Sequence, residues 1–267
     1  MRTLKMLLSL AALSGTFGLS GLAHAQAPAN PDKVSICHEN EDAFPWLLKT
    51  KPGYSQIMIQ HLEKQLGVPV KLVAMPWKQC LAELKSGAVD GAMNASFSKD
   101  RAEFAHYPMK MDGDADATKR MYRTSYALYR AKGAAVSWDG QKLVTAGTVG
   151  AQTGFSIVNQ LKELGVKVED SSPTADELLG RVASGRYVAA ALQTTEAENT
   201  LASNAALGPK LERLNPALVE KAYYTIFSKP FFAKHGQTAR DVWRIEAKIR
   251  ESAEFKTSVS HLMKSVD

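Results

Sequence analysis

The spacing of apolar side chains divides the first half of the chain into short strands and helices. Residues 34–37 alternate between apolar and polar positions, which is typical of a strand. Residues 54–66 place Met58, Leu62 and Leu66 on one face, and Gly67 follows as a stop signal, so a helix is predicted there. A strand at 68–73, a helix at 77–86 and a short buried strand at 89–93 follow. This β-α-β-α-β order indicates a parallel sheet covered by helices.

The second half repeats this order of elements. We predict, in chain order, a strand within 142–149 that ends at Gly150, a helix at 153–164, a strand at 166–168, a helix at 174–184 and a strand at 187–192. In both halves a helix ends at a Ser-Gly pair and a strand of small residues follows, at Ser86-Gly87 and at Ser184-Gly185. The repeat indicates two α/β lobes of related design.

Two further strand-like runs, at 125–129 and 223–228, lie between and after these lobes. We expect them to cross between the lobes as a double hinge. The tail at 238–266 has helical amphipathic spacing and is predicted to pack on the first lobe. The expected fold class is therefore α/β, with two Rossmann-like lobes, a two-strand hinge and a ligand cleft between the lobes. Lobe 1 is expected at 26–125 and 226–267, and lobe 2 at 126–225 with the hinge strands.

The first 25 residues have the pattern of a secretory signal peptide. Arg2 and Lys5 precede an apolar stretch at 6–22, and Ala23-His24-Ala25 is a small-x-small cleavage site. A membrane anchor is the alternative, but Ser, Gly and Thr interrupt the stretch, whereas a spanning helix needs about 20 apolar residues. No cysteine follows the cleavage site, as a lipoprotein would require. We expect cleavage after Ala25 and a soluble periplasmic protein.

Composition and charge narrow the class of partner. The 267 residues are 45% hydrophobic and 22% charged, which is an ordinary globular composition. The net charge is +6, and removal of Arg2 and Lys5 leaves 31 basic against 27 acidic residues, or +4. No run of Lys and Arg exceeds two residues, so a nucleic-acid partner is not expected. The scattered histidines suggest no metal site, and no motif suggests a cofactor.

The two cysteines, Cys37 and Cys80, both lie after the cleavage site. An even number of cysteines in an oxidising compartment favours a disulfide. Two buried thiols are one alternative. A metal pair that includes His38 is another, although the spacing resembles no zinc framework.

Three segments at 76–81, 84–91 and 96–101 carry a motif pattern. They supply an aromatic residue after the second strand, a Gly-x-x-Asp before the third, and a Ser-x-x-x-x-Arg after it. With Tyr107-Pro108 further along, the mature chain resembles family 3 periplasmic solute-binding proteins, the amino-acid-binding type with two type II lobes. The resemblance implies that Arg101 clamps the α-carboxylate of the ligand and that Trp77 stacks on its side chain.

Other ligand contacts follow from the same comparison and from general geometry. Ligands of open α/β sheets bind beyond the carboxyl ends of the strands, where Asn94 and Ser96 are expected. Arg101 can offer a carboxylate two parallel hydrogen bonds; its alternative role is an ion pair with Asp100 or Glu103 on a solvated helix. The resemblance also implies an aromatic wall and an anion-binding helix start, whose residues are Phe44, Trp46, Thr153 and Gly154. Core packing is the alternative for the aromatic residues, and a plain helix cap for Thr153.

One position departs from the family pattern. The aspartate that binds the α-amino group of the ligand is replaced by Gln193, which cannot balance an ammonium charge. Glu196, or Glu39 and Asp42 from the first loop, could do so instead. Otherwise the ligand is not an ordinary amino acid.

We therefore expect a monomeric, non-enzymatic binding protein. It would capture a small carboxylate-bearing ligand, such as an amino acid or a derivative, close around it by hinge motion, and serve an inner-membrane ABC permease or a sensor. The alternative is a dehydratase-like enzyme on the same fold, which would need a cleft acid or base with a shifted pKa. Glu39, Asp42 and Glu196 are the candidates for that role.

Overall fold

The structure is a computed structural model in which residues 30–263 are described. The predicted signal peptide at 1–25 lies outside the described residues. One large sheet has the strand order β2-β1-β3-β12-β5-β10-β8-β9, with β4 beside β12 and β11 beside β5. Its strands are β1 (Val34–Glu39), β2 (Val70–Met75), β3 (Gly91–Ser96), β4 (Ala105–His106), β5 (Tyr122–Ala131), β8 (Val149–Gln152), β9 (Val168–Ser172), β10 (Ala189–Gln193), β11 (Leu211–Arg213) and β12 (Val219–Ser228). A separate two-stranded ribbon pairs β6 (Ser137–Trp138) with β7 (Leu143–Val144).

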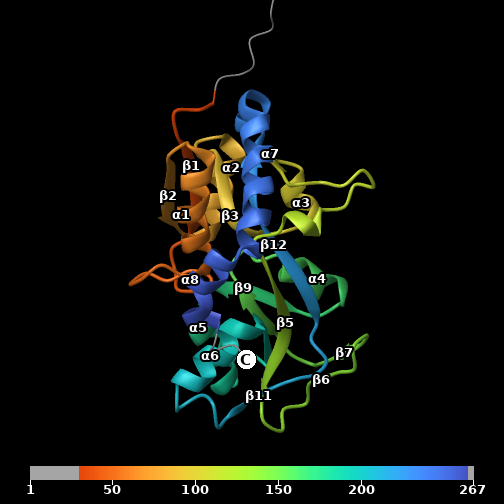
Figure 1. Ribbon diagram of the computed structural model, residues 1–267. Coiled ribbons are helices and arrows are strands. Elements are labelled where there is room, and N and C mark those ends of the chain that lie inside the picture. The colour runs from red at the N-terminus through yellow and green to blue at the C-terminus, as the bar shows by residue number, and fades with distance from the viewer. Residues whose placement is uncertain (1–29, 264–267) are drawn as a thin grey trace, which may run out of the picture.

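The helices gather around the two ends of this sheet (Figure 1). They are α1 (Tyr54–Leu66), α2 (Trp77–Ser86), α3 (Lys99–Ala102), α4 (Ile157–Glu163), α5 (Ala175–Ala183), α6 (Thr194–Ser203), α7 (Lys229–Glu251) and α8 (Ala253–Met263), with a 3-10 turn at Ala117–Lys119. Helices α1, α2 and α7 lie at the end formed by β1, β2 and β3, whereas α4, α5 and α6 lie at the other. The two-lobe α/β architecture predicted from the sequence is confirmed.

Two antiparallel strands connect the lobes. β12 pairs with β5 over Val219–Tyr223 and then with β3 over Tyr223–Phe227. β5 in turn pairs with β10 of the other lobe. The predicted crossing runs at 125–129 and 223–228 are thus parts of two ten-residue strands, β5 and β12.

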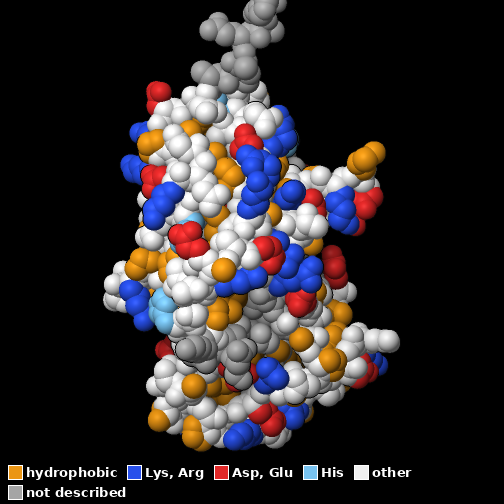
Figure 2. Space-filling view, viewed as in Figure 1, with side chains coloured by type: hydrophobic (Ala, Val, Ile, Leu, Met, Phe, Trp, Pro, Cys, Tyr) orange, Lys and Arg blue, Asp and Glu red, His pale blue; other side chains and the backbone are white. Residues whose placement is uncertain are grey.

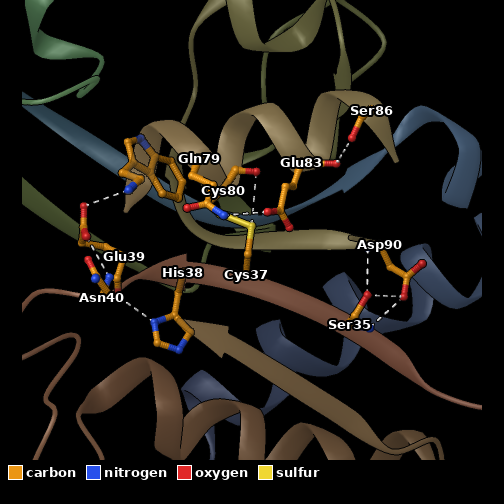
Figure 3. The surroundings of a disulfide bond; sticks show 11 residues. Ser35, Cys37, His38, Glu39, Asn40, Gln79, Cys80, Glu83, Ser86 and Asp90 are labelled. Carbon is orange, nitrogen blue, oxygen red and sulfur yellow. Dashed lines mark hydrogen bonds between the residues drawn. A yellow bond between two sulfur atoms is a disulfide. The ribbon is translucent and has the colours of Figure 1, made fainter. Parts of the chain in front are cut away.

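The disulfide prediction is confirmed. Cys37 of β1 and Cys80 of α2 are bonded and fully buried (Figure 3). This disulfide joins β1 to the helix that packs over it. It therefore fixes the position of the carboxyl end of β1 relative to the start of α2. Both segments contribute residues to the cavity described below.

Several predicted boundaries are wrong. Helix α4 begins at Ile157 and not at 153, because Gly154 has a left-handed backbone (φ 73°) that no helix accommodates. The predicted strand that ends at Gly150 is two strands, β7 and β8, and β3 continues to Ser96. Helix α6 was not predicted.

The tail, predicted to be helical over 238–266, forms two helices, and the first begins earlier than predicted. Helix α7 begins at Lys229, where the Ser228 hydroxyl accepts a hydrogen bond from the N–H of Phe231 and Pro230 occupies the first turn. Ser252 is extended and separates α7 from α8. The tail does pack on the first lobe, where α7 and α8 both contact α1. Basic side chains run along the outer face of α7 (Figure 2).

Candidate ligand cavity

A cavity lies between the lobes, and the space within it, open solvent at its mouth included, is about 530 Å³. Both lobes and both crossing strands supply its walls. Eight residues predicted from the sequence line it, namely Glu39, Asp42, Trp46, Trp77, Asn94, Ser96, Arg101 and Gln193. Lining residues that we did not predict as ligand contacts are Glu41, Ala43, Leu47, Tyr122, Tyr126, Gln152, Phe155, Ser156, Pro173 and Tyr223.

Arg101 is the cationic group of this cavity. It lies on the single turn α3 after β3, and its side chain is buried, with 6% exposed. Nη1 donates to the Ser96 carbonyl at 2.9 Å and Nη2 to the Gly154 carbonyl at 2.8 Å. Its guanidinium also lies 5.4 Å from the centre of the Trp77 ring. A further contact of 3.4 Å joins Nη1 to the Ser96 hydroxyl. These contacts occupy three of the five N–H donors of the guanidinium.

The alternative role for Arg101, as a solvated ion pair, does not fit this geometry. The carboxylate of Asp100 accepts instead from Asn159 of the other lobe, at 2.7 Å. The Arg101 side chain lines the cavity, where its planar guanidinium could bind a carboxylate.

Asn94 points an amide into the cavity because β3 is irregular at this position. The register between β3 and β12 shifts near it, and within residues 30–263 Asn94 is alone among non-glycine residues in having a positive φ, of 61°. Its Oδ1 accepts from the Ser55 hydroxyl at 2.7 Å. Its Nδ2 is buried and has no hydrogen-bond partner in the described structure. A buried donor without a partner is costly, so this amide is suited to a ligand acceptor.

Thr153, Gly154 and Phe44 do not line the cavity. The N–H of Thr153 donates to the Ser172 carbonyl and that of Gly154 to Asp170. The N–H groups of Thr153 and Gly154 are therefore engaged within the second lobe. Gly154 contributes instead through its carbonyl, which accepts from Arg101. Phe44 packs on the core and lines a separate hollow beside α6.

Direct contacts hold the lobes together around the cavity. The hydroxyls of Ser96 and Ser156 are 2.7 Å apart. Lys78 of α2 forms an ion pair with Asp170 of β9 at 3.4 Å. Together with the contacts of Arg101 and Asp100 described above, these place the lobes in a closed arrangement.

Two glutamines form the second-lobe wall. Gln193 ends β10 and Gln152 ends β8, and the side-chain oxygen of each is buried without a partner among the described residues. Gln152 Nε2 donates to Glu196 at 3.1 Å. Glu196 lies behind this wall and lines the hollow beside α6 rather than the cavity. Burial raises the pKa of Glu196 to about 8, so its carboxyl group is uncharged at neutral pH.

The acidic residues of the first loop are already engaged. Glu39 accepts from the N–H of Asn40 at 2.7 Å and of Trp77 at 3.2 Å (Figure 3), and burial raises its pKa. Glu41 forms an ion pair with Lys49 at 2.7 Å. Asp42 accepts from the backbone N–H of the same lysine at 2.6 Å.

Aromatic rings form the apolar walls. Trp46 stacks on Tyr122 at 3.7 Å between ring centres, and Tyr122 stacks on Tyr223 at 4.8 Å. The Tyr223 hydroxyl donates to that of Tyr126 at 3.0 Å. Such flat, buried surfaces accept the apolar part of a small ligand.

A second cation lies just behind the lining. Lys221 of β12 donates to the Ser156 hydroxyl at 3.0 Å. Burial, and then the charge of Arg101, lower the pKa of Lys221 to about 8. Lys221 lies two residues before the crossing run predicted at 223–228, and we did not predict it as a functional residue.

Residues 30–263 contain neither a metal-binding cluster nor a membrane-spanning helix. Within residues 30–263 no group of three or more His, Cys, Asp or Glu is arranged to hold a metal ion. Over the same range, none of the helices combines the length and the apolar character that crossing a bilayer requires.

Comparisons with known proteins identify the fold. No family model matches the sequence, and no curated protein matches it. Among solved structures, a histidine kinase sensor domain with similarity to periplasmic binding proteins has a TM-score of 0.69 at 15% identity, over 86% of this chain and 96% of that chain. The GluR0 ligand-binding core from Nostoc punctiforme, in complex with L-glutamate, has a TM-score of 0.67 at 14% identity, over 86% and 98%.

A third match is AbpA, an amino acid ABC transporter substrate-binding protein from Streptococcus pneumoniae bound to L-arginine. Its TM-score is 0.64 at 18% identity, over 88% of this chain and 97% of that chain. Near-complete coverage at such low identity establishes a shared shape, and not a shared ligand. The chain has the two-lobe α/β fold of periplasmic binding proteins, as the sequence predicted.

Proposed function

We propose that this protein is a periplasmic solute-binding protein that captures a small carboxylate-bearing ligand between its lobes. The observation that carries the proposal is Arg101, a buried guanidinium that lines a cavity between the lobes. A carboxylate is the small-molecule group that best matches a planar guanidinium fork.

The described arrangement supports capture by lobe closure. Lobe 1 comprises residues 26–125 and 226–267 and lobe 2 residues 126–225 in this proposal, with β5 and β12 as the hinge. Contacts such as Ser96 to Ser156 form only while the lobes are together. A ligand that binds both lobes would favour this closed state.

Delivery to an inner-membrane ABC transporter or a sensor is the accompanying role. The structures of similar shape include proteins described as amino acid ABC transporter components and one described as a histidine kinase sensor domain. Export after cleavage behind Ala25 and a monomeric state belong to the same proposal. The alternative of an enzyme on this fold finds no support among those structures.

The test is a thermal-shift screen of the mature protein against amino acids, organic acids, amines, sugars and metal ions, followed by titration calorimetry. A ligand at 100 times its Kd stabilises the protein by about 2.7 kcal/mol. We expect carboxylates to raise the melting temperature. A screen in which only uncharged sugars or metal ions do so would refute the proposal, and mass spectrometry of the recovered ligand would reveal any turnover.

A further inference from the structure

We propose that the ligand carries an uncharged hydrogen-bond donor, a hydroxyl or an amide N–H, next to its carboxylate, where an α-amino acid carries an ammonium group. This inference rests on the proposed function, because it assumes that Arg101 binds a carboxylate. It concerns the groups that surround the ligand at the Arg101 end of the cavity.

The second-lobe wall offers two neutral acceptors. The Oε1 atoms of Gln152 and Gln193 are buried and have no partner within residues 30–263, and both residues line the cavity. The orientation of Gln152 is fixed, because its Nε2 donates to Glu196 and to the Pro173 carbonyl. A ligand group that donates to either oxygen removes the cost of a buried acceptor without a donor, and a single O–H or N–H serves one of the two. Amide oxygens satisfy an O–H or a neutral N–H fully but leave an ammonium charge unbalanced.

Acidic groups of the cavity region are poorly suited to balance such a charge. Glu196 lies behind Gln152, outside the cavity lining, and its buried carboxyl group is uncharged at neutral pH. Glu39 accepts from backbone N–H groups, and Glu41 is paired with Lys49. Asp42 accepts from the backbone N–H of Lys49, so each of these first-loop acids already has a partner.

The Arg101 end of the cavity is instead doubly cationic. A continuous chain of contacts runs from Lys221 Nζ to the Ser156 hydroxyl at 3.0 Å, to the Ser96 hydroxyl at 2.7 Å, and on to Arg101. Both serines line the cavity. An ammonium group beside the bound carboxylate would thus share the cavity with Arg101 and two neutral oxygens, with Lys221 behind Ser156. A hydroxyl or an amide N–H carries no charge. It would therefore suffer neither repulsion from a cation nor the cost of an unbalanced charge.

The experiment is titration calorimetry with matched series that differ only at the α-position. Each series contains an L-amino acid, its 2-hydroxy acid and its N-acetyl derivative, for the side chains of alanine, aspartate, glutamate, phenylalanine and arginine. For any side chain that binds, we expect the hydroxy acid or the N-acetyl form to bind at least about tenfold more tightly than the amino acid. Equal or tighter binding of the amino acid would overturn this inference and leave carboxylate capture intact.

Two variants locate the effect. Gln193→Asp supplies a charged acceptor and should shift the preference toward the amino acid by about tenfold or more. Gln193→Ala introduces no buried charge and should remove the preference. It provides the test if the aspartate variant does not fold. Gln141→Asp, in an exposed loop, is the matched control and should leave the preference unchanged. An unchanged preference in a folded Gln193 variant would overturn the inference, and a failure of every carboxylate to bind would overturn the proposed function with it.

Discussion

Replacement of Arg101 by alanine tests the placement of the ligand site. The ligand carboxylate would lose its cationic partner inside a closed cavity where the guanidinium is only 6% exposed. Truncation of one partner of a buried charged pair costs roughly 2–5 kcal/mol. At about 1.4 kcal/mol per factor of ten, affinity should fall by roughly 30- to 3,000-fold. Arg101→Lys retains the charge without the planar fork and should recover only part of this loss.

The ligand-free fold should tolerate the change. The Ser96 carbonyl keeps the hydroxyl of Tyr107 as a donor at 2.9 Å, so chiefly the Gly154 carbonyl loses a bond. One hydrogen bond is worth about 1 kcal/mol, or a melting-point shift of roughly 2–4 °C for a protein of this size. Since the Gly154 bond joins the lobes, the loss should appear in the closed state.

Titration calorimetry with a carboxylate found in the screen measures the affinity, and differential scanning calorimetry measures the stability. Arg186→Ala is the control, because that side chain is 62% exposed and lies away from the cavity. Binding by folded Arg101→Ala within a few-fold of the unmodified protein would show that Arg101 does not hold the ligand.

Three further outcomes are expected. The double change Cys37→Ser with Cys80→Ser should lower the free energy of unfolding by about 4 kcal/mol in denaturant titrations, because the disulfide spans 43 residues. Stability should fall as the pH rises from about 5 to 8, because burial raises the pKa of Glu246 to about 8 and the folded state therefore holds a proton that the unfolded state has released. In urea titrations at several pH values, Glu246→Gln should reduce this slope by up to about 1.4 kcal/mol per pH unit. Asn159→Ala should weaken ligand binding by roughly two- to tenfold in calorimetry, because its 2.7 Å bond to Asp100 joins the lobes.

Matched changes separate these effects from general damage. Asn204→Ala removes a bond to Asp176 within the second lobe and should leave affinity unchanged. Glu103→Gln, at an exposed position, should leave the pH slope unchanged. Two free thiols in the unfolded, unreduced protein would contradict the disulfide prediction. A pH slope as steep in Glu246→Gln as in the unmodified protein would contradict the second prediction, since Glu196 accounts for only part of the slope. An affinity equally reduced by Asn204→Ala would contradict the third.

Local signals explain why the first helices could be predicted to the residue. Helices α1 and α2 have clear apolar spacing and end at Gly67 and Gly87, which adopt the left-handed conformation that glycine favours at a helix end. Helix α6 gave no such signal, because its first turn is Thr194-Thr195-Glu196 and few of its residues are apolar. Its formation depends on packing against β5 and α5, which no local pattern records.

The cavity was only partly predictable for a related reason. Gln193 ends a strand, and Arg101 and Trp77 follow strand ends, a position that is informative in any open α/β sheet. Tyr122, Tyr126 and Tyr223 lie within the crossing strands, where aromatic residues are ordinarily interpreted as core. They face the ligand space because strands that connect two lobes also pass beneath the cleft between them.

The path of the chain has a consequence for how the protein is made. The first lobe is completed by the last segments to be synthesised, since β12 pairs with β3 and α7 and α8 pack against α1. Met58 of α1, for example, belongs to the same buried cluster as Ile249 and Phe255. On a growing chain, the apolar face of α1 therefore has no cover until nearly the whole polypeptide has emerged, whereas the second lobe is continuous in sequence. Folding should begin with the second lobe. The first lobe is synthesised earlier but stays incomplete until the last segments emerge, so it should be the part that depends on chaperones.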